Sequence, residues 1–207
     1  MTKHPGLDDL PQRRESGEDR RVAIAGAARA IIVEKGLEGL RTRDIAARVG
    51  INIATLHYHV PTKEALIALV AASLRDDFKS QALRHPKAGL AAAAQLREEF
   101  KEFREMVAEM PQVIGVLSEL VDRARRDTTI ADIILPMQAF WTQQYTEIFR
   151  LGITDGSFRK SIDPAAAAVI TTAALTDCWR PHRRDQLDSV IAELERAFAP
   201  ISDSSQG

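Results

Sequence analysis

The residues best suited to chemistry lie between positions 42 and 63, where polar side chains alternate with small apolar ones. The polar members of this stretch are Thr42, Arg43, Asn52, Thr55, His57, Tyr58, His59 and Lys63. Guanidinium, amide and hydroxyl groups bind phosphate oxygens and base edges, so the stretch predicts a nucleic-acid contact. A metal site formed by His57 and His59 is disfavoured, because residues two apart on a helix point about 200° away from each other.

Motifs typical of enzymes and cofactor sites are missing from the sequence. It contains no G-x-G-x-x-G, no P-loop, no H-E-x-x-H and no G-x-S-x-G, and it has one cysteine, Cys178. We therefore expect no catalytic residue, no cofactor, no metal and no internal disulfide. Cys178, next to Trp179, fits a small core or interface residue, and a redox sensor is the lesser alternative.

The charge distribution favours a DNA contact near the N-terminus. Residues 13–63 hold 10 Lys and Arg against 6 Asp and Glu, whereas the whole chain holds 28 against 29 and has a net charge of −1. A locally basic face binds phosphates although the whole chain is not basic. No apolar run approaches the roughly 20 residues of a membrane helix, and no leader-like segment opens the chain, so we expect a cytoplasmic protein without membrane contact.

Apolar spacing predicts the helices that position the polar stretch. A first helix starts near residue 20 and ends at Gly36, with its inward residues at Ile24, Ala27, Ala28, Ile31 and Ile32. Two short helices follow over 42–49 and 53–59, joined by a three-residue turn and stopped before Pro61. Such tightly joined helices cross steeply, which is the helix-turn-helix plan in which the second helix enters the major groove.

The rest of the chain also favours helices. Thr62 is the expected N-cap of a helix that runs to about Ser80, and further helices are expected at 88–109, 112–125, 129–151, 164–179 and 184–199, with a loop at 152–161. The predicted fold is all-α, a three-helix helix-turn-helix domain followed by a helical bundle. We expect four segments: a flexible arm at 1–19, a DNA-binding domain at 20–61, a ligand-binding and dimerisation domain at 62–201, and a disordered tail at 202–207.

Two stretches make the resemblance to a known family specific. They are GLEGLRTRDIA at 36–46 and VGINIATLHYHVPTKEAL at 49–66, and they resemble the tetracycline-repressor (TetR) family of transcriptional regulators. The resemblance covers about residues 20–74. It implies that Arg43 reads a base edge, that Tyr58, His59 and Lys63 contact phosphates, and that base or sugar contacts come from the turn Asn52, Ile53, Ala54 and Thr55.

Several positions depart from the usual pattern of the family. Position 53 is often polar there but is Ile here, and position 57 is often Tyr but is His. An isoleucine can contact a thymine methyl group but cannot hydrogen-bond a base edge. The departures therefore bear on the operator sequence rather than on DNA binding itself.

A homodimer is expected, because one helix-turn-helix makes too few contacts for specific binding and two-fold symmetry matches a palindromic site. The last two long helices carry apolar, small-residue faces typical of an interface. Its expected residues are Val169, Ile170, Ala173, Leu187, Val190, Ile191 and Leu194.

The aromatic residues of the second half suggest a site for a small-molecule effector that is apolar or aromatic. Helix bundles place ligand cavities between helices, and Trp141 and Tyr145 are neighbours one helical turn apart with polar tips that need partners. The expected pocket residues are Phe103, Met106, Trp141 and Tyr145, and the alternative is that they are plain core.

The function expected from these features is a transcriptional regulator that binds a palindromic DNA operator as a homodimer and is released by a small molecule. Repression is the commoner mode of the resembled family. Two alternatives remain: a protein of the same fold that acts through protein contacts only, and a helical enzyme.

Overall fold

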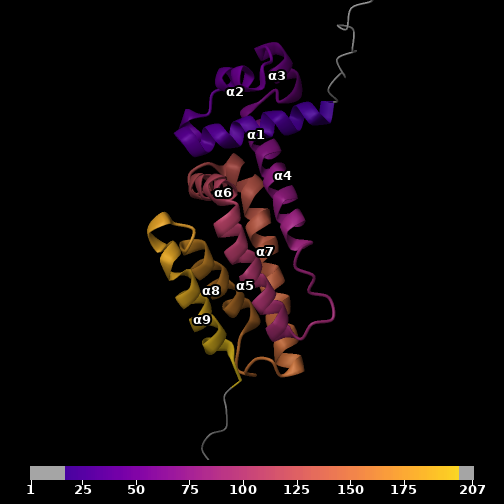
Figure 1. Cartoon of the computed structure of the whole chain (residues 1–207), viewed down its shortest axis with the longest axis vertical. Helices are drawn as coiled ribbons and strands as arrows, with labels where there is room; N and C mark the ends of the chain where they lie inside the picture. Colours follow the sequence, from indigo (N-terminus) through magenta and orange to yellow (C-terminus); the bar gives the residue numbers. More distant parts are fainter. Residues whose placement is uncertain (1–16, 201–207) are drawn as a thin grey trace, which may run out of the picture.

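The structure, a computed structural model, describes residues 17–200, and the regular elements in this range are all helical (Figure 1). The predicted tail, and the predicted arm up to residue 16, lie outside the described residues. No helix within 17–200 is long and apolar enough to cross a membrane. The helices are α1 Gly17–Lys35, a 3-10 turn Leu37–Gly39, α2 Thr42–Val49, α3 Ile53–His59, α4 Lys63–Ala82, α5 Ala92–Glu109, α6 Pro111–Ala124, α7 Thr128–Asp155, α8 Pro164–Asp177, a 3-10 turn Pro181–Gln186 and α9 Leu187–Phe198.

The first three helices form a small unit at one end of the molecule (Figure 1). Both α2 and α3 pack against α1 around fully buried apolar side chains that include Ile31, Ile45 and Leu56. The bounds predicted for α2 and α3 are confirmed. Gly50 ends α2 with a left-handed φ of 74°, a conformation that glycine adopts without steric cost.

The other helices form an elongated bundle along the long axis of the molecule (Figure 1). The longest of them, α7, contacts α4, α5, α6 and α8, while α9 packs on α8. Phe100 and Phe149 are fully buried between these helices. Because α4 contacts both α1 and α7, it connects the N-terminal unit to the bundle.

The predicted loop at 152–161 was wrong at its start, because α7 continues to Asp155. Gly152 is buried within this helix, and the ring of Phe158 packs so closely on it that a Cβ atom would lie 1.9 Å from Cδ2. The glycine therefore serves a close approach between segments rather than the end of a helix. The true end is Gly156, which has a left-handed φ of 79°.

Other predicted bounds also differ from the structure. Residues 17–19, assigned to the arm, are helical. The helix expected from 88 begins at Ala92, since Gly89 adopts a left-handed φ of 78°. The last helix begins at Leu187 rather than 184, because a 3-10 turn precedes it.

Candidate nucleic-acid interface and aromatic cluster

Helix α3 is fixed at both of its ends. At the start, the side-chain oxygen of Asn52 accepts a hydrogen bond from the Thr55 amide at 2.7 Å. At the end, Arg21 of α1 donates to the His59 carbonyl at 3.1 Å. Leu56 is completely buried between them, so the orientation of α3 follows from packing as well as from both caps.

Ion pairs hold α2 against α1. Arg48 donates two hydrogen bonds to Glu34, at 2.9 and 2.8 Å, and Lys35 contacts Asp44 at 3.1 Å. The hydrogen bond from Arg48 lowers the pKa of Glu34, and the one from Lys35 lowers the pKa of Asp44. Sequence reasoning missed these pairs, because their partners lie on different helices and no spacing rule connects them.

Most of the predicted DNA-contact residues lie on the surface of this unit. Tyr58 is 84% exposed and the Arg43 side chain is 79% exposed, with a 3.5 Å contact between Arg43 and Asp44. Thr55 and His59 are half-buried, and the ring of Tyr58 stands edge-on to His59. The exposed members of the set are Thr42, Arg43, Asn52, Ile53, Ala54, His57, Tyr58 and Lys63.

Two helix N-termini border the same surface. Thr62 caps α4 by accepting from the Ala65 amide at 3.1 Å, as predicted, and Lys63 is the first residue of that helix. The N-cap of α2 is Arg41, whose side chain makes no capping hydrogen bond. Its carbonyl accepts from the Asp44 amide at 3.1 Å, so the amides of Thr42 and Arg43 are the ones that can face another acceptor.

The N-terminal unit is tied to the bundle through two helices. Arg29 of α1 forms a 2.7 Å ion pair with Asp77 of α4. Glu119 of α6 accepts from the Leu37 amide at 3.3 Å, and Arg123 of α6 contacts Glu38. The sequence predicted only the connection through α4, whereas α6 holds the segment between α1 and α2.

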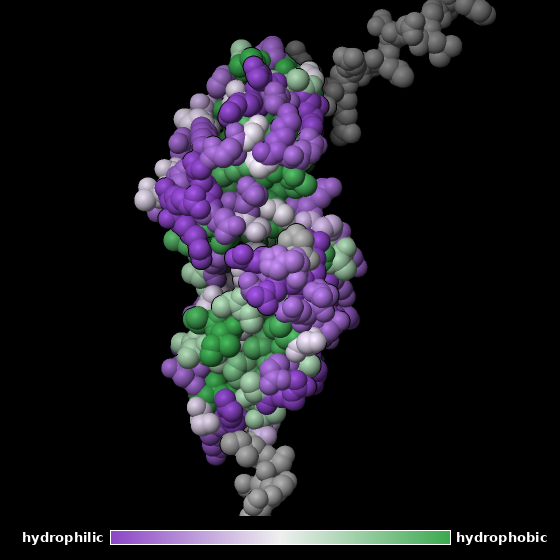
Figure 2. Space-filling model, turned by 90° about the vertical axis from the view of Figure 1, so that its left-hand side faces the viewer, coloured by the Kyte–Doolittle hydropathy of each residue, from purple (hydrophilic) through white to green (hydrophobic). Residues whose placement is uncertain are grey.

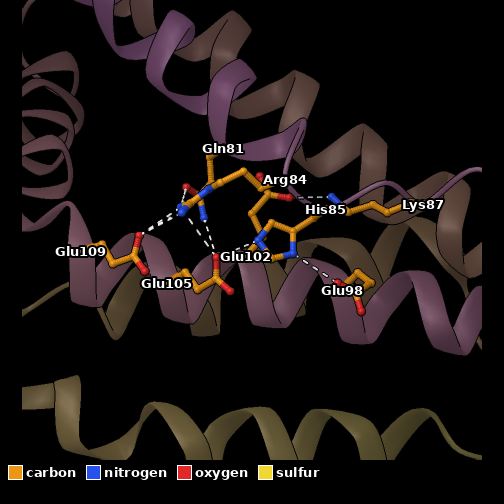
Figure 3. Close-up of polar contacts among 8 residues, drawn as sticks. All are labelled: Gln81, Arg84, His85, Lys87, Glu98, Glu102, Glu105 and Glu109. Atoms are coloured by element: carbon orange, nitrogen blue, oxygen red, sulfur yellow. Dashed lines mark hydrogen bonds and ion pairs between the residues drawn. The ribbon is translucent and has the colours of Figure 1, made fainter.

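A polar cluster fixes the far end of α4 to α5 (Figure 3). The ring of His85 is buried, with Nδ1 at 3.2 Å from Glu98 and Nε2 at 2.8 Å from Glu105. Both contacts are hydrogen bonds only when the ring carries both protons. Arg84 adds ion pairs to Glu105 and Glu109, so the segment that directly follows α4 is tied to α5.

The predicted pocket residues come together inside the bundle. Phe103 of α5 and Trp141 of α7 lie at a centroid distance of 5.9 Å with near-parallel rings, and Tyr145 stands edge-on to Trp141 at 5.7 Å. Met106 is buried in the same core. Sequence reasoning missed Trp179 as a member, although its ring stacks on both Phe103 and Trp141, at 6.3 and 6.1 Å.

The residues expected at the dimer interface fall into two groups. Val169 and Ile170 are 57% and 56% exposed, Ala173 is exposed as well, and Val190 is half-buried. Figure 2 shows this side of the molecule as a broad hydrophobic area in its lower half, where α8 and α9 lie. The assignment fails for Leu187, Ile191 and Leu194, whose side chains are buried in the protomer's own core.

Cys178 is buried beside the aromatic cluster. Burial raises the pKa of its thiol, which lowers the fraction of reactive thiolate. This environment supports the packing interpretation of the cysteine over the redox one.

Comparisons with known proteins agree with the arrangement of the helices. The profile of the family described as "Bacterial regulatory proteins, tetR family" matches residues 24–70. The repressor KstR2 of Rhodococcus jostii is 24% identical over 147 residues, 70% of each chain. The class D tetracycline repressor protein of Escherichia coli is 33% identical over 84 residues, 41% of this chain and 38% of the repressor.

Solved structures show the same fold over most of the chain. A TetR-family regulator from Agrobacterium tumefaciens matches with a TM-score of 0.76 at 18% identity, covering 89% of this chain and all of the other. The ketosteroid transcriptional regulator KstR2 of Mycobacterium tuberculosis matches with a TM-score of 0.66 at 18% identity, covering 87% and 95%.

Proposed function

We propose that the chain is a transcriptional repressor of the TetR family, which is not a family of enzymes, and that it binds a palindromic operator as a homodimer. Proteins of this family bind DNA operators. The observation that carries the proposal is the two-sided character of α3, where Leu56 is completely buried and Tyr58 almost fully exposed. A helix fixed inward in this way presents a constant outer face to the major groove.

The exposed residues of this face have different roles in the proposed complex. Arg43 reads a guanine edge through its guanidinium, and Ile53 contacts a thymine methyl group. Tyr58, His59 and Lys63 contact phosphates, as does the open first turn of α2 near Thr42. Asn52 has its oxygen engaged in the cap of α3, so it contributes its amide group.

The homodimer forms through the exposed apolar face of α8, supported by Val190 of α9. Val169, Ile170 and Ala173 form one continuous helical face, and apolar residues this exposed are typical of a subunit contact. Light scattering at micromolar concentration tests it. A dimer that becomes monomeric in Ile170→Glu supports this face, and a wild-type monomer contradicts it.

A small-molecule effector in the bundle releases the operator by changing the spacing of the two reading helices. Half-sites recur at about 34–36 Å, so a shift of a few ångströms prevents both helices from seating. The route runs along α4 from the cluster at His85 to Thr62. An inducer must bind the operator complex more weakly than the free dimer, by the same factor that it weakens operator binding.

The decisive experiment measures operator affinity at several salt concentrations, using the DNA upstream of the chain's own gene. Lys63→Ala should flatten the salt dependence, because one phosphate contact is lost, and Arg43→Ala should also relax base preference. Arg75→Ala on α4 is the matched control, since it removes an exposed positive charge far along the sequence from the reading face. If Lys63→Ala and Arg43→Ala both kept the wild-type operator affinity, the assigned DNA-binding face would be wrong. If the wild-type protein did not bind DNA, a regulator that acts through protein contacts would be favoured.

A further inference from the structure

Two buried hydrogen-bond donors in the aromatic cluster have no acceptor among the described residues. They are the O–H of Tyr145, whose oxygen faces the donor of the Trp141 indole, and the indole Nε1 of Trp179. Tyr145 is completely buried and Trp179 is 5% exposed. More than about nine in ten buried polar groups in proteins are hydrogen-bonded, so two unpaired donors on rings that both pack against Trp141 indicate a partner from outside the chain.

The shape of the cluster favours a flat partner. The rings of Phe103, Trp141 and Trp179 are parallel to within 10° to 13° of one another, although they come from three separate segments. Aromatic rings attract other rings in offset-stacked arrangements, so a planar ring system gains contact with all three at once. Trp141 is only partly buried, which puts one side of the cluster near the surface.

The charges around the cluster disfavour an anionic partner. Glu99 and Glu102 of α5 act on Tyr145, and Lys87 contacts each of these carboxylates at 2.6 Å. The three groups together carry a net negative charge when all are ionised. Burial, and then the two carboxylates, raise the pKa of Tyr145, so its hydroxyl keeps its proton and can donate it.

We propose that the cluster binds a flat, uncharged aromatic compound with a carbonyl oxygen that accepts hydrogen bonds from Tyr145 and Trp179. Indole nitrogen can only donate, and the tyrosine hydroxyl lies beside carboxylates that oppose its ionisation, so the ligand supplies the acceptor. The proposal rests on the proposed function, in which the bundle holds an effector site, and adds the chemical class of that effector.

The test compares three probes that differ only in the group on one ring system: acetylnaphthalene, ethylnaphthalene and naphthoate. Equilibrium dialysis with the full-length dimer measures each affinity. The ketone should bind about tenfold more tightly than the hydrocarbon, because it pairs donors that the hydrocarbon leaves buried and unpaired. Naphthoate should bind most weakly, because its charge lies near the two glutamates.

Two variants assign the preference to the donors. Tyr145→Phe and Trp179→Phe keep a ring at each position, so the ratio of ketone to hydrocarbon affinity should fall in each and disappear in the double variant. Thermal melting followed by circular dichroism confirms that each variant is folded. Phe140→Leu on α7, at a ring that is 68% exposed, should leave the ratio unchanged.

Each outcome decides the proposal. The proposal is overturned if ketone and hydrocarbon bind equally, if naphthoate binds more tightly than the ketone, or if none of the three probes binds. It is also overturned if the preference for the ketone survives in the double variant. Operator affinity is measured separately with the same preparations. If the ketone binds selectively but does not change operator affinity, the ligand class stands and the proposed release mechanism is contradicted. If the wild-type protein does not bind the operator at all, only the proposed function is contradicted.

Discussion

The two parts of the molecule place their polar groups in opposite ways. In the N-terminal unit the side chains proposed to bind DNA lie outside a small apolar core, and their internal ion pairs are on the surface. In the bundle, polar groups such as His85 and Tyr145 lie inside. Function and stability are therefore separable in the first part, where a contact can be removed without disturbing the fold, and are linked in the second.

The largest effect should come from the inner side of α3. Leu56→Ala should lower the free energy of unfolding by about 2–5 kcal/mol, because it empties space in a completely buried site. Tyr58→Ala, two residues away and 84% exposed, should stay within about 0.5 kcal/mol while weakening DNA binding. Urea denaturation followed by circular dichroism measures both, and a similar loss in the two variants would erase the proposed separation.

In the bundle, a single methyl group should be enough to disturb packing. Gly152→Ala should cost about 1–3 kcal/mol, since its Cβ would meet the ring of Phe158 and overpack the site. The control is Gly26→Ala in α1, where a Cβ meets nothing within 4 Å and the better helix propensity should add up to about 1 kcal/mol. If thermal melting showed the two variants shifted in the same direction, the close approach at Gly152 would not matter for stability.

Removing a buried hydroxyl should leave the bundle as stable or make it more stable. Without ligand, Tyr145→Phe should raise the free energy of unfolding by up to about 1 kcal/mol, because the proton of the hydroxyl is buried without an acceptor. Tyr58→Phe should change nothing, as water solvates that hydroxyl. A clear loss of stability in Tyr145→Phe, measured by the same urea titration, would show that the hydroxyl is paired in solution.

The smallest effect concerns acid. Asp155 accepts the Ala92 amide at 2.8 Å and so caps α5 from the end of α7, and this hydrogen bond leads the lowering of its pKa. A lowered pKa in the folded state contributes stability above about pH 4 that is lost as the pH falls. Asp155→Asn should therefore reduce the loss of stability as the pH falls. Thermal melting between pH 3 and 7, in steps of about one pH unit, measures this dependence. Asp132→Asn, at an exposed position on α7, should leave that slope as it is.

The helices of the N-terminal unit were predicted closely from the sequence, because the residues that start and end them act locally. Gly50 and Pro61 end α2 and α3, and Asn52 and Thr62 cap the helices that follow them. Each signal acts within one turn of its own residue, so tertiary packing had little to override.

The bundle was predicted less well, because periodicity shows which residues share a face but not what that face meets. Leu187, Ile191 and Leu194 form a regular apolar stripe, which suits a partner subunit as well as the protomer's own core. On α8 the face of Val169 is exposed while the face of Leu175 is buried. Gly152 shows the same limit, since a glycine that permits close packing cannot be told from one that ends a helix.

The stacking of Trp141 on Trp179 has a spectroscopic consequence. The chain contains only these two tryptophans, both in the aromatic cluster, and the DNA-binding unit has none. With centroids 6.1 Å apart and near-parallel rings, the two indoles lie in one environment, so a rearrangement of the cluster should change the fluorescence of both. Because the proposed DNA-binding face lies at the other end of the molecule, a change in emission when DNA is added would measure the coupling between the two parts without any label.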